Sequence, residues 1–162
     1  MEKEFQNEIE FIKSVFPQHN ERKKNPLDHS LRVGQLLFET GCSQDVIRAG
    51  LLHDAIEWTD ADPEDIKDRF GDHVLEIILA NTKDRNITDP VERRKDYTER
   101  CAEVGLDALL VKGADVLDSY RFYSQAHDEA ELDRSKQIIS LVLDALDGTQ
   151  HPLIDKLQTE IK

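Results

Sequence analysis

Four polar residues interrupt apolar helical patterns in this sequence. His53 and Asp54 stand next to each other inside one apolar run, and Asp115 stands inside another. His29 falls in the first turn of a predicted helix whose inward positions are apolar. An unpaired carboxylate in apolar surroundings costs several kcal/mol, so such a group usually pairs with a cation or coordinates a metal.

The donor types indicate which metals would fit if these side chains met. Two imidazoles and two carboxylates make a mixed nitrogen and oxygen site, which suits Mn, Fe, Zn or Mg. The set has no thiolate, which argues against a purely structural zinc centre. Simpler interpretations stay open: His29 as a capping or surface residue, His53 as a hydrogen-bonded core histidine, and Asp115 as a salt-bridged or capping group.

Helices must position these residues, because no stretch alternates apolar and polar residues as a strand does. Proline follows a capping residue at Asn25, Asp62 and Asp89, which predicts three helix starts. The expected helices cover about residues 5–16, 26–40, 44 onward through His53-Asp54, 63–70, 72–79 with Asp72 as cap, 90–105, 106–123, 129–147 and 152 onward. The expected fold is all-α, a compact irregular or orthogonal helical bundle forming one domain over residues 1–162.

The charge balance limits the classes of partner that the chain is expected to bind. The chain has 34 acidic and 21 basic residues among 162, a net charge of −13. Nucleic acids and anionic membrane surfaces are therefore poor partners. A small, highly charged substrate remains compatible, provided that a local cationic pocket or a bound metal offsets the global field.

Other classes of chemistry and location are disfavoured by missing motifs. Cys42 and Cys101 are far apart and belong to no CxxC pair, so we expect neither a disulfide framework nor a thiolate zinc site. The sequence lacks a glycine-rich phosphate loop and a Gly-x-Ser-x-Gly motif. It also lacks a signal-peptide pattern and an apolar run of about 20 residues. The absence of these last two features predicts a cytoplasmic location.

The order of the four polar residues resembles a known family pattern. One His is followed by His-Asp 24 residues later and by Asp about 60 residues beyond. This order resembles the H…HD…D pattern of the HD superfamily of metal-dependent phosphohydrolases, which are all-α bundles. The resemblance covers roughly residues 22–121.

A narrower likeness is to the hydrolase domain of the RelA/SpoT class and to the small alarmone hydrolases. It rests on His53-Asp-Ala-Ile-Glu57-Trp-Thr59, the spaced Ile66, Phe70-Gly71 and Val74, Asn81-Thr82-Lys83, and Lys112-Gly-Ala-Asp115 followed by Ser119-Tyr-Arg121. Members of that class remove the 3′-pyrophosphate from guanosine tetra- and pentaphosphate, usually with Mn²⁺. The resemblance implies the same reaction class here.

The resemblance also implies roles for individual residues. His29, His53, Asp54 and Asp115 would hold the metal, with Mn²⁺ expected and Fe, Zn, Mg, Co or Ni as alternatives. Glu57 would act on the attacking water, since it lies one helical turn after the His-Asp pair and its carboxylate can face the same point. The implied substrate contacts are Arg22 and Lys23, which resemble the family's Arg-Lys pair ahead of the first His, together with Lys83, Ser119 and Arg121.

The sequence departs from the family pattern close to these positions. Trp58 stands where the family has a second acid, and Ser119 replaces its usual asparagine. The pair Arg22-Lys23 lies closer to His29 than in typical members. We therefore expect an intact metal site with an altered set of substrate contacts.

We expect a metal-dependent phosphohydrolase that acts on a small phosphorylated nucleotide, most like the alarmone pyrophosphohydrolases. One alternative is an HD nucleotidase or phosphodiesterase that acts on a different nucleotide. Another is a sensor that binds a nucleotide or metal without turnover, which Trp58 makes plausible. The sequence also leaves a homo-oligomer open.

Overall fold

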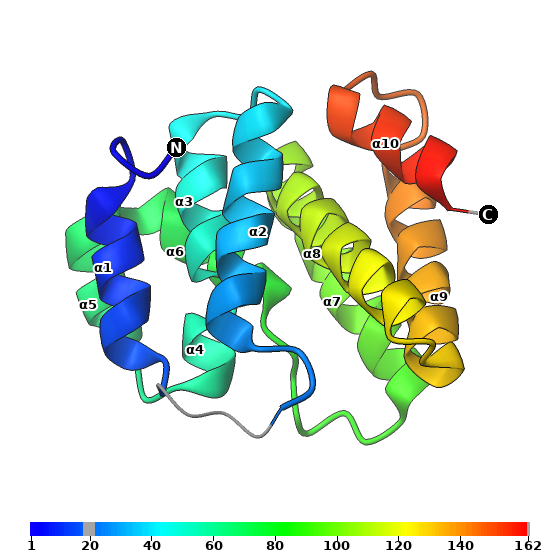
Figure 1. Ribbon diagram of the computed structural model, residues 1–162, viewed down its shortest axis with the longest axis horizontal. Coiled ribbons are helices and arrows are strands. Elements are labelled where there is room, and N and C mark those ends of the chain that lie inside the picture. The colour runs from blue at the N-terminus through cyan, green and yellow to red at the C-terminus, as the bar shows by residue number, and fades with distance from the viewer. Residues whose placement is uncertain (18–21, 162) are drawn as a thin grey trace.

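A computed structural model describes residues 1–17 and 22–161, and within those ranges the secondary structure is entirely helical (Figure 1). The described helices are α1 (Gln6–Val15), α2 (Pro26–Glu39), α3 (Gln44–Leu52), α4 (Ala55–Trp58), α5 (Pro63–Phe70), α6 (Asp72–Asn81), α7 (Pro90–Val104), α8 (Leu106–Gln125), α9 (Glu129–Ala145) and α10 (Pro152–Glu160). The predicted all-α class is confirmed.

Helix starts follow the capping chemistry that the sequence indicates. The Asn25 side chain accepts hydrogen bonds from the backbone N–H groups of Leu27 and Asp28 at 2.9 and 3.2 Å. Asp62 and Asp89 cap α5 and α7 in the same way, each with proline following. The predicted cap at Asp72 is wrong, because Gly71 occupies the cap position of α6 with a φ of 101° that favours glycine.

The chain breaks its helix at His53-Asp54, where the sequence predicts continuity. α3 ends at Leu52, and α4 begins again at Ala55. His53 Nδ1–H donates to the Gly50 carbonyl at 2.7 Å. A side chain therefore bonds to this carbonyl near the end of α3. The break places the His-Asp pair at a junction between two helices.

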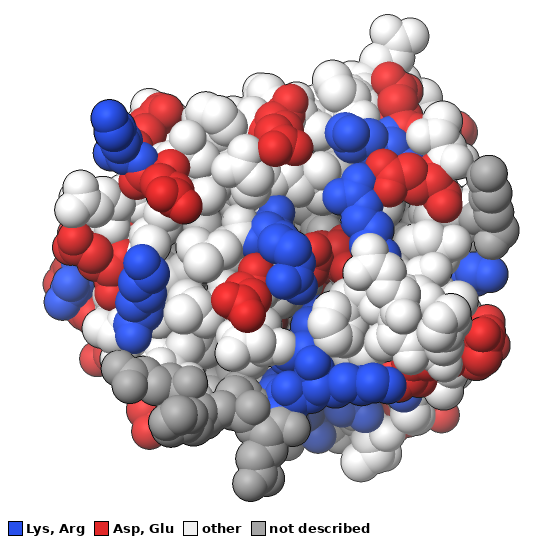
Figure 2. All heavy atoms as spheres, viewed as in Figure 1, with Lys and Arg blue, Asp and Glu red and all other residues white. Residues whose placement is uncertain are grey.

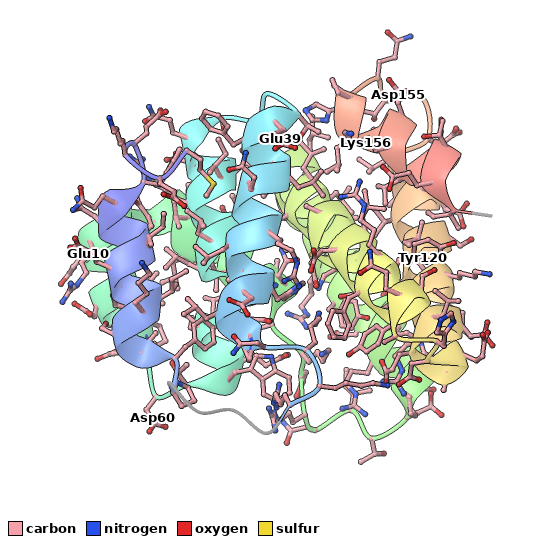
Figure 3. The ribbon with its side chains drawn as sticks, in the orientation of Figure 1. Glu10, Glu39, Asp60, Tyr120, Asp155 and Lys156 are labelled. Carbon is pink, nitrogen blue, oxygen red and sulfur yellow. The ribbon has the colours of Figure 1, made fainter. Side chains whose placement is uncertain are left out.

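The long helix α8 is central to the bundle (Figure 1). It packs against α2, α3, α6, α7, α9 and α10. Fully buried side chains such as Leu37, Leu52, Ile77 and Leu117 fill the space between these helices. Charged side chains such as Glu10 lie on the outer surface (Figure 3). Among the described residues, no helix is long and apolar enough to cross a membrane.

Two glycines let α2 and α3 approach each other closely. A Cβ added at Gly34 would meet the Leu51 side chain, with Leu51 Cγ only 2.6 Å away. A Cβ added at Gly50 would meet the terminal Cδ1 of Leu37. Since α2 carries His29 and α3 ends at His53, this close contact brings the two histidines within reach of one another.

We predict that Gly34→Ala destabilises the protein by about 1–2 kcal/mol. The clash with Leu51 costs roughly 1–3 kcal/mol, and the better helix propensity of alanine recovers up to ~1 kcal/mol. Gly50→Ala should cost less, because the end of the Leu37 side chain can move aside. Urea unfolding followed by circular dichroism measures both. A Gly34→Ala protein as stable as the wild type would contradict the close contact.

Candidate active site

The structure brings the four predicted ligand residues together. His29 comes from α2, His53 and Asp54 from the junction of α3 and α4, and Asp115 from α8. Asp115 Oδ1 lies 3.1 Å from His29 Nε2 and 3.8 Å from His53 Nε2. Asp54 Oδ1 lies 3.5 Å from His53 Nε2, and Asp54 Oδ2 lies 4.0 Å from His29 Nε2. His29, His53 and Asp115 therefore present donor atoms within 4.8 Å of one another, and the Asp54 carboxylate lies beside the two histidines.

Both imidazoles are oriented by a second hydrogen bond. His29 Nδ1 lies 2.6 Å from Asp118 Oδ2, and His53 Nδ1 donates to the Gly50 carbonyl. Such bonds fix the tautomer and direct Nε2 toward the common point, as in metal-binding histidines. His53 Nε2 is fully buried and has no hydrogen-bond partner among the described residues. An orphaned nitrogen beside two carboxylates fits a divalent cation.

Asp118 contacts the cluster, and the sequence reasoning did not predict it. Its carboxylate accepts two hydrogen bonds from Arg32, at 2.7 and 2.9 Å, besides its contact with His29. Burial raises the pKa of Asp118, but the hydrogen bonds from His29 and Arg32 lower it by a larger amount. The pKa of Asp118 therefore lies below its usual value. Its position three residues after Asp115, on the same face of one helix, is the signal that would have found it.

Positive charge favours the ionised form of these largely buried carboxylates. Lys112 Nζ, itself buried, lies 3.1 Å from Asp115 Oδ2. Burial raises the pKa of Asp115, yet Lys112 and the two histidines bring it well below its usual range. The pKa of Asp54 is likewise lowered, because the attraction of His53 and His29 exceeds the effect of burial. Anionic oxygens are the form in which carboxylates bind metals.

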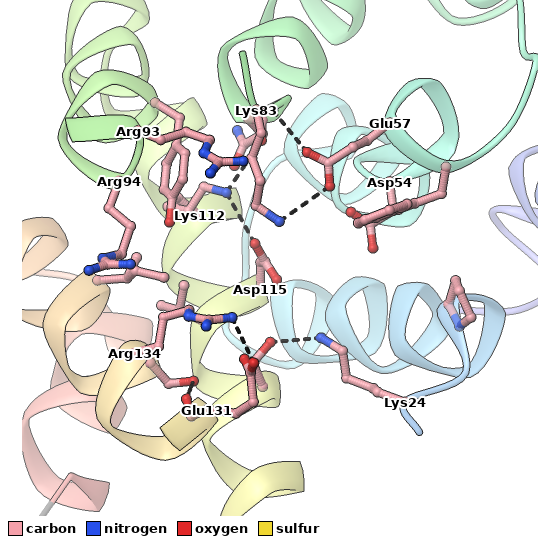
Figure 4. A pocket seen from close by; sticks show the side chains of 18 of the residues that line it. Lys24, Asp54, Glu57, Lys83, Arg93, Arg94, Lys112, Asp115, Glu131 and Arg134 are labelled. Atoms are coloured by element: carbon pink, nitrogen blue, oxygen red, sulfur yellow. Dashed lines mark hydrogen bonds and ion pairs between the residues drawn. The ribbon is translucent and has the colours of Figure 1, made fainter. Parts of the chain in front are cut away.

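A cavity of about 700 Å³ opens beside this cluster, between α2, α4, α7, α8 and α9 (Figure 4). Nine cationic side chains line it: Arg22, Lys23, Lys24, Lys83, Arg85, Arg93, Arg94, Lys112 and Arg134. Four acidic residues line it as well: Asp54, Glu57, Asp115 and Glu131. Figure 2 shows lysine and arginine side chains gathered at the lower centre of one face. The cationic pocket that an anionic substrate requires is therefore present in a chain of net charge −13.

Glu57 lines the cavity, and its side chain is only 5% exposed. Glu57 Oε1 accepts a hydrogen bond from the Lys83 backbone N–H at 2.9 Å, and Oε2 lies 3.4 Å from Lys83 Nζ (Figure 4). These contacts hold the carboxylate in one place, a single turn of α4 away from Asp54. Glu57 can therefore accept a proton from a group bound at the cluster.

The predicted substrate contacts divide into two groups. Lys23, Lys83 and Ser119 reach the cavity, as does Arg22, although Lys23 also pairs with Asp128 at 2.9 Å. In the part of the chain that the structure describes, Arg121 does not line the cavity. Its guanidinium makes two hydrogen bonds, of 2.8 and 2.6 Å, to Glu160 in α10.

Several cavity cations were missed by sequence reasoning. Lys24 Nζ donates to Ser119 Oγ at 2.8 Å, and Arg93 and Arg94 enter from α7. Arg134 enters from α9, where it pairs with Glu131 at 2.6 Å (Figure 4). In the sequence, charged residues on amphipathic helices indicate a solvent-exposed face. Only the packing of α7 and α9 shows that these side chains line the cavity.

Comparison with known proteins gives a consistent result. Residues 9–143 match the HD domain family. A guanosine-3′,5′-bis(diphosphate) 3′-pyrophosphohydrolase MESH1 of Drosophila melanogaster is 33% identical over 67% of this chain and 64% of its own length. The enzyme of the same activity from Aquifex aeolicus is 33% identical over 73% of this chain, which spans 17% of that protein. The MESH1 of Danio rerio is 31% identical over 86% of this chain and 83% of its own.

Solved structures agree with these matches. A metazoan ortholog of SpoT that hydrolyses ppGpp superimposes with a TM-score of 0.79 and 28% identity, covering 97% of this chain and 92% of its own. A Listeria monocytogenes protein superimposes with a TM-score of 0.71 and 26% identity, over 83% and 91% of the two chains.

We predict that the purified protein carries about one divalent ion per chain and that His53→Ala loses it. The substitution removes a donor whose nitrogen otherwise has no partner, so metal affinity should fall steeply. Elemental analysis measures the ion, and circular dichroism checks the fold. His73→Ala, at an exposed histidine paired with Asp107, is the matched control and should keep its metal. Stoichiometric metal in His53→Ala would rule out the assignment.

We also predict that Asp118→Asn weakens divalent-metal binding by about 10–100-fold, as loss of a residue supporting a ligand histidine typically does. The amide keeps the size of the side chain but supports the His29 tautomer poorly. Competition with a chromogenic chelator measures the affinity. An unchanged dissociation constant would leave Asp118 with a purely structural role.

Proposed function

The chain belongs to the HD domain family, and on this premise we propose that it is a divalent-metal-dependent phosphohydrolase that removes the 3′-pyrophosphate of guanosine 3′,5′-bis(diphosphate) or of a closely similar nucleotide. The observation that carries the proposal is the convergence of two imidazoles and two carboxylates beside a cavity lined by nine cations. The curated relatives named above act on this nucleotide, and the cavity offers positive charge for more than one phosphate group.

We propose Mn²⁺ as the resident ion, held by His29, His53, Asp54 and Asp115. The mixed nitrogen and oxygen donors suit it, and the set contains no thiolate that would favour a softer ion. A divalent ion bound there would lower the pKa of a water molecule and polarise a phosphoryl oxygen.

The chain's own residues have three tasks in this proposal. Glu57 takes the proton of the attacking water on its carboxylate, which Lys83 holds in position. Lys24 and Lys83, at the edge of the cluster, neutralise phosphate charge as it develops. Arg93, Arg94 and Arg134, farther along α7 and α9, bind phosphate at a distance from the cluster.

Product analysis with the purified protein, Mn²⁺ and a panel of nucleotides tests the function. Pyrophosphate released from guanosine 3′,5′-bis(diphosphate) supports the proposal. Orthophosphate released from a monophosphate instead favours a nucleotidase, and release of a nucleoside phosphate from a diester favours a phosphodiesterase. Tight binding of a nucleotide with no product favours a sensor.

We predict that Glu57→Gln keeps its metal while turnover falls by about 10²–10⁴-fold, the usual contribution of a general base. The amide oxygen can still accept the Lys83 N–H, so the local structure should persist. Saturating substrate and confirmed metal content isolate the chemical step. Glu64→Gln, at an exposed position in the first turn of α5, is the control. Equal turnover in Glu57→Gln and wild type would assign Glu57 to structure alone.

Other expectations from the sequence remain predictions. They are the single domain over residues 1–162, the contact of Arg121 with substrate, the cytoplasmic location and the homo-oligomer. A contact between Arg121 and substrate would require its two hydrogen bonds to Glu160 to open.

A further inference from the structure

Trp58 is surrounded by cations at the wall of the cavity. The Arg22 guanidinium carbon lies 3.3 Å from the centre of the indole ring, so the two groups are stacked. The Arg85 guanidinium carbon lies 5.0 Å from the same ring, and Lys83 Nζ lies 5.6 Å from it. All four residues line the cavity. We call Trp58, Arg22, Lys83 and Arg85 the tryptophan cluster.

The cluster gathers three cationic side chains at the cavity wall. An indole ring attracts cations through the negative face of its π system, but it carries no charge that would neutralise them. Glu57 supplies one carboxylate, and Lys83 pairs with it at 3.4 Å. The hydrogen bond of Arg85 goes to the backbone carbonyl of Glu57, at 3.3 Å, which is a neutral acceptor. Like charges gathered in this way favour an anionic ligand between them.

The cluster also lies next to the proposed metal ligands. The backbone N–H of Trp58 donates to the Asp54 carbonyl at 3.1 Å, so the two residues are one helical turn apart. Side chains at this spacing are neighbours, with roughly 5–6 Å between their Cβ atoms. A ligand with one phosphate group at the His/Asp cluster would therefore bring an adjoining phosphate group to the tryptophan cluster.

We propose that the tryptophan cluster is a binding subsite for a second phosphate group, adjoining the one at the His/Asp cluster, and that Trp58 thereby selects diphosphate over monophosphate ligands. The inference rests on the proposed function for the identity of the phosphate groups that bind. The subsite itself is formed by protein side chains and does not require the metal. An indole at this position, unlike a carboxylate, does not repel the ligand.

Trp58 is the single tryptophan of the chain, so its fluorescence reports directly on the subsite. The probe is inorganic pyrophosphate, titrated into the full-length protein with its metal and again with excess chelator. We expect a saturable change in emission under both conditions. A change that disappears with the chelator would mean that pyrophosphate binds only through the metal, and it would overturn the proposal.

Substitutions locate the binding. Arg22→Gln and Arg85→Gln should each weaken pyrophosphate binding by about fivefold to tenfold, consistent with the loss of one charge-assisted phosphate contact. Arg69→Gln is the matched control, because Arg69 also lies over an aromatic ring, that of Phe11 at 5.4 Å, but outside the cavity. Equal affinities in all three variants and the wild type would overturn the proposal.

The ring itself is tested by calorimetry, since its replacement removes the fluorescent reporter. Trp58→Leu should weaken pyrophosphate binding about fivefold or more, and Trp58→Phe should recover most of the affinity because phenylalanine also attracts cations. A Trp58→Leu protein that is folded and binds pyrophosphate as tightly as the wild type would contradict the role of the ring.

These results are independent of the proposed activity. If the wild type hydrolyses the alarmone and Arg22→Gln and Arg85→Gln have the same KM as wild type, the function stands and the subsite fails. If the wild type releases no pyrophosphate from any nucleotide but binds inorganic pyrophosphate in an Arg85-dependent way, the subsite stands and the function fails.

Discussion

The mutual compensation of two acidic and two imidazole side chains at one largely buried point is the constraint on which the structure depends. Asp54 and Asp115 would each be costly in an apolar bundle, and the groups around them lower the pKa of both carboxyls against the effect of burial. Lys112 in α8 supplies a positive charge, and His29 in α2 and His53 at the junction of α3 and α4 lie beside the carboxylates. The packing of α2, α3 and α8 therefore assembles the site, and the favourable contacts among its charged and polar groups depend on that packing.

A chain of supporting contacts extends outward from that point. Asp118 holds His29, Arg32 holds Asp118, and the Gly50 carbonyl holds His53. The break between α3 and α4 is part of this arrangement, because it frees the His53 side chain to bond backward along α3. Precise placement thus arises from hydrogen bonds one layer away from the proposed ligands.

The sequence predicted the elements and the central cluster because both leave local signals. Capping residues followed by proline mark three helix starts, and polar residues inside apolar runs mark the cluster. The same reasoning could not reach the contacts that only tertiary packing decides. Arg121 stands at a position of the family motif, yet its guanidinium donates a hydrogen bond to Glu160, which lies far along the chain in α10. Arg93 and Arg134 look like ordinary surface charges until α7 and α9 pack side by side.

The contrast between a strongly acidic chain and a cationic cavity affects how an anion would arrive. At physiological ionic strength the Debye length is about 8 Å, so the repulsion of the distant acidic surface is largely screened. The attraction inside the cavity acts over shorter distances and in a lower dielectric, where mobile ions screen it less. Moderate salt therefore weakens the long-range repulsion of an anion more than the attraction inside the cavity, and diffusional capture depends on the last few ångströms. At low ionic strength the net charge of −13 repels large polyanions, while the cationic cavity retains the small anionic ligands that enter it.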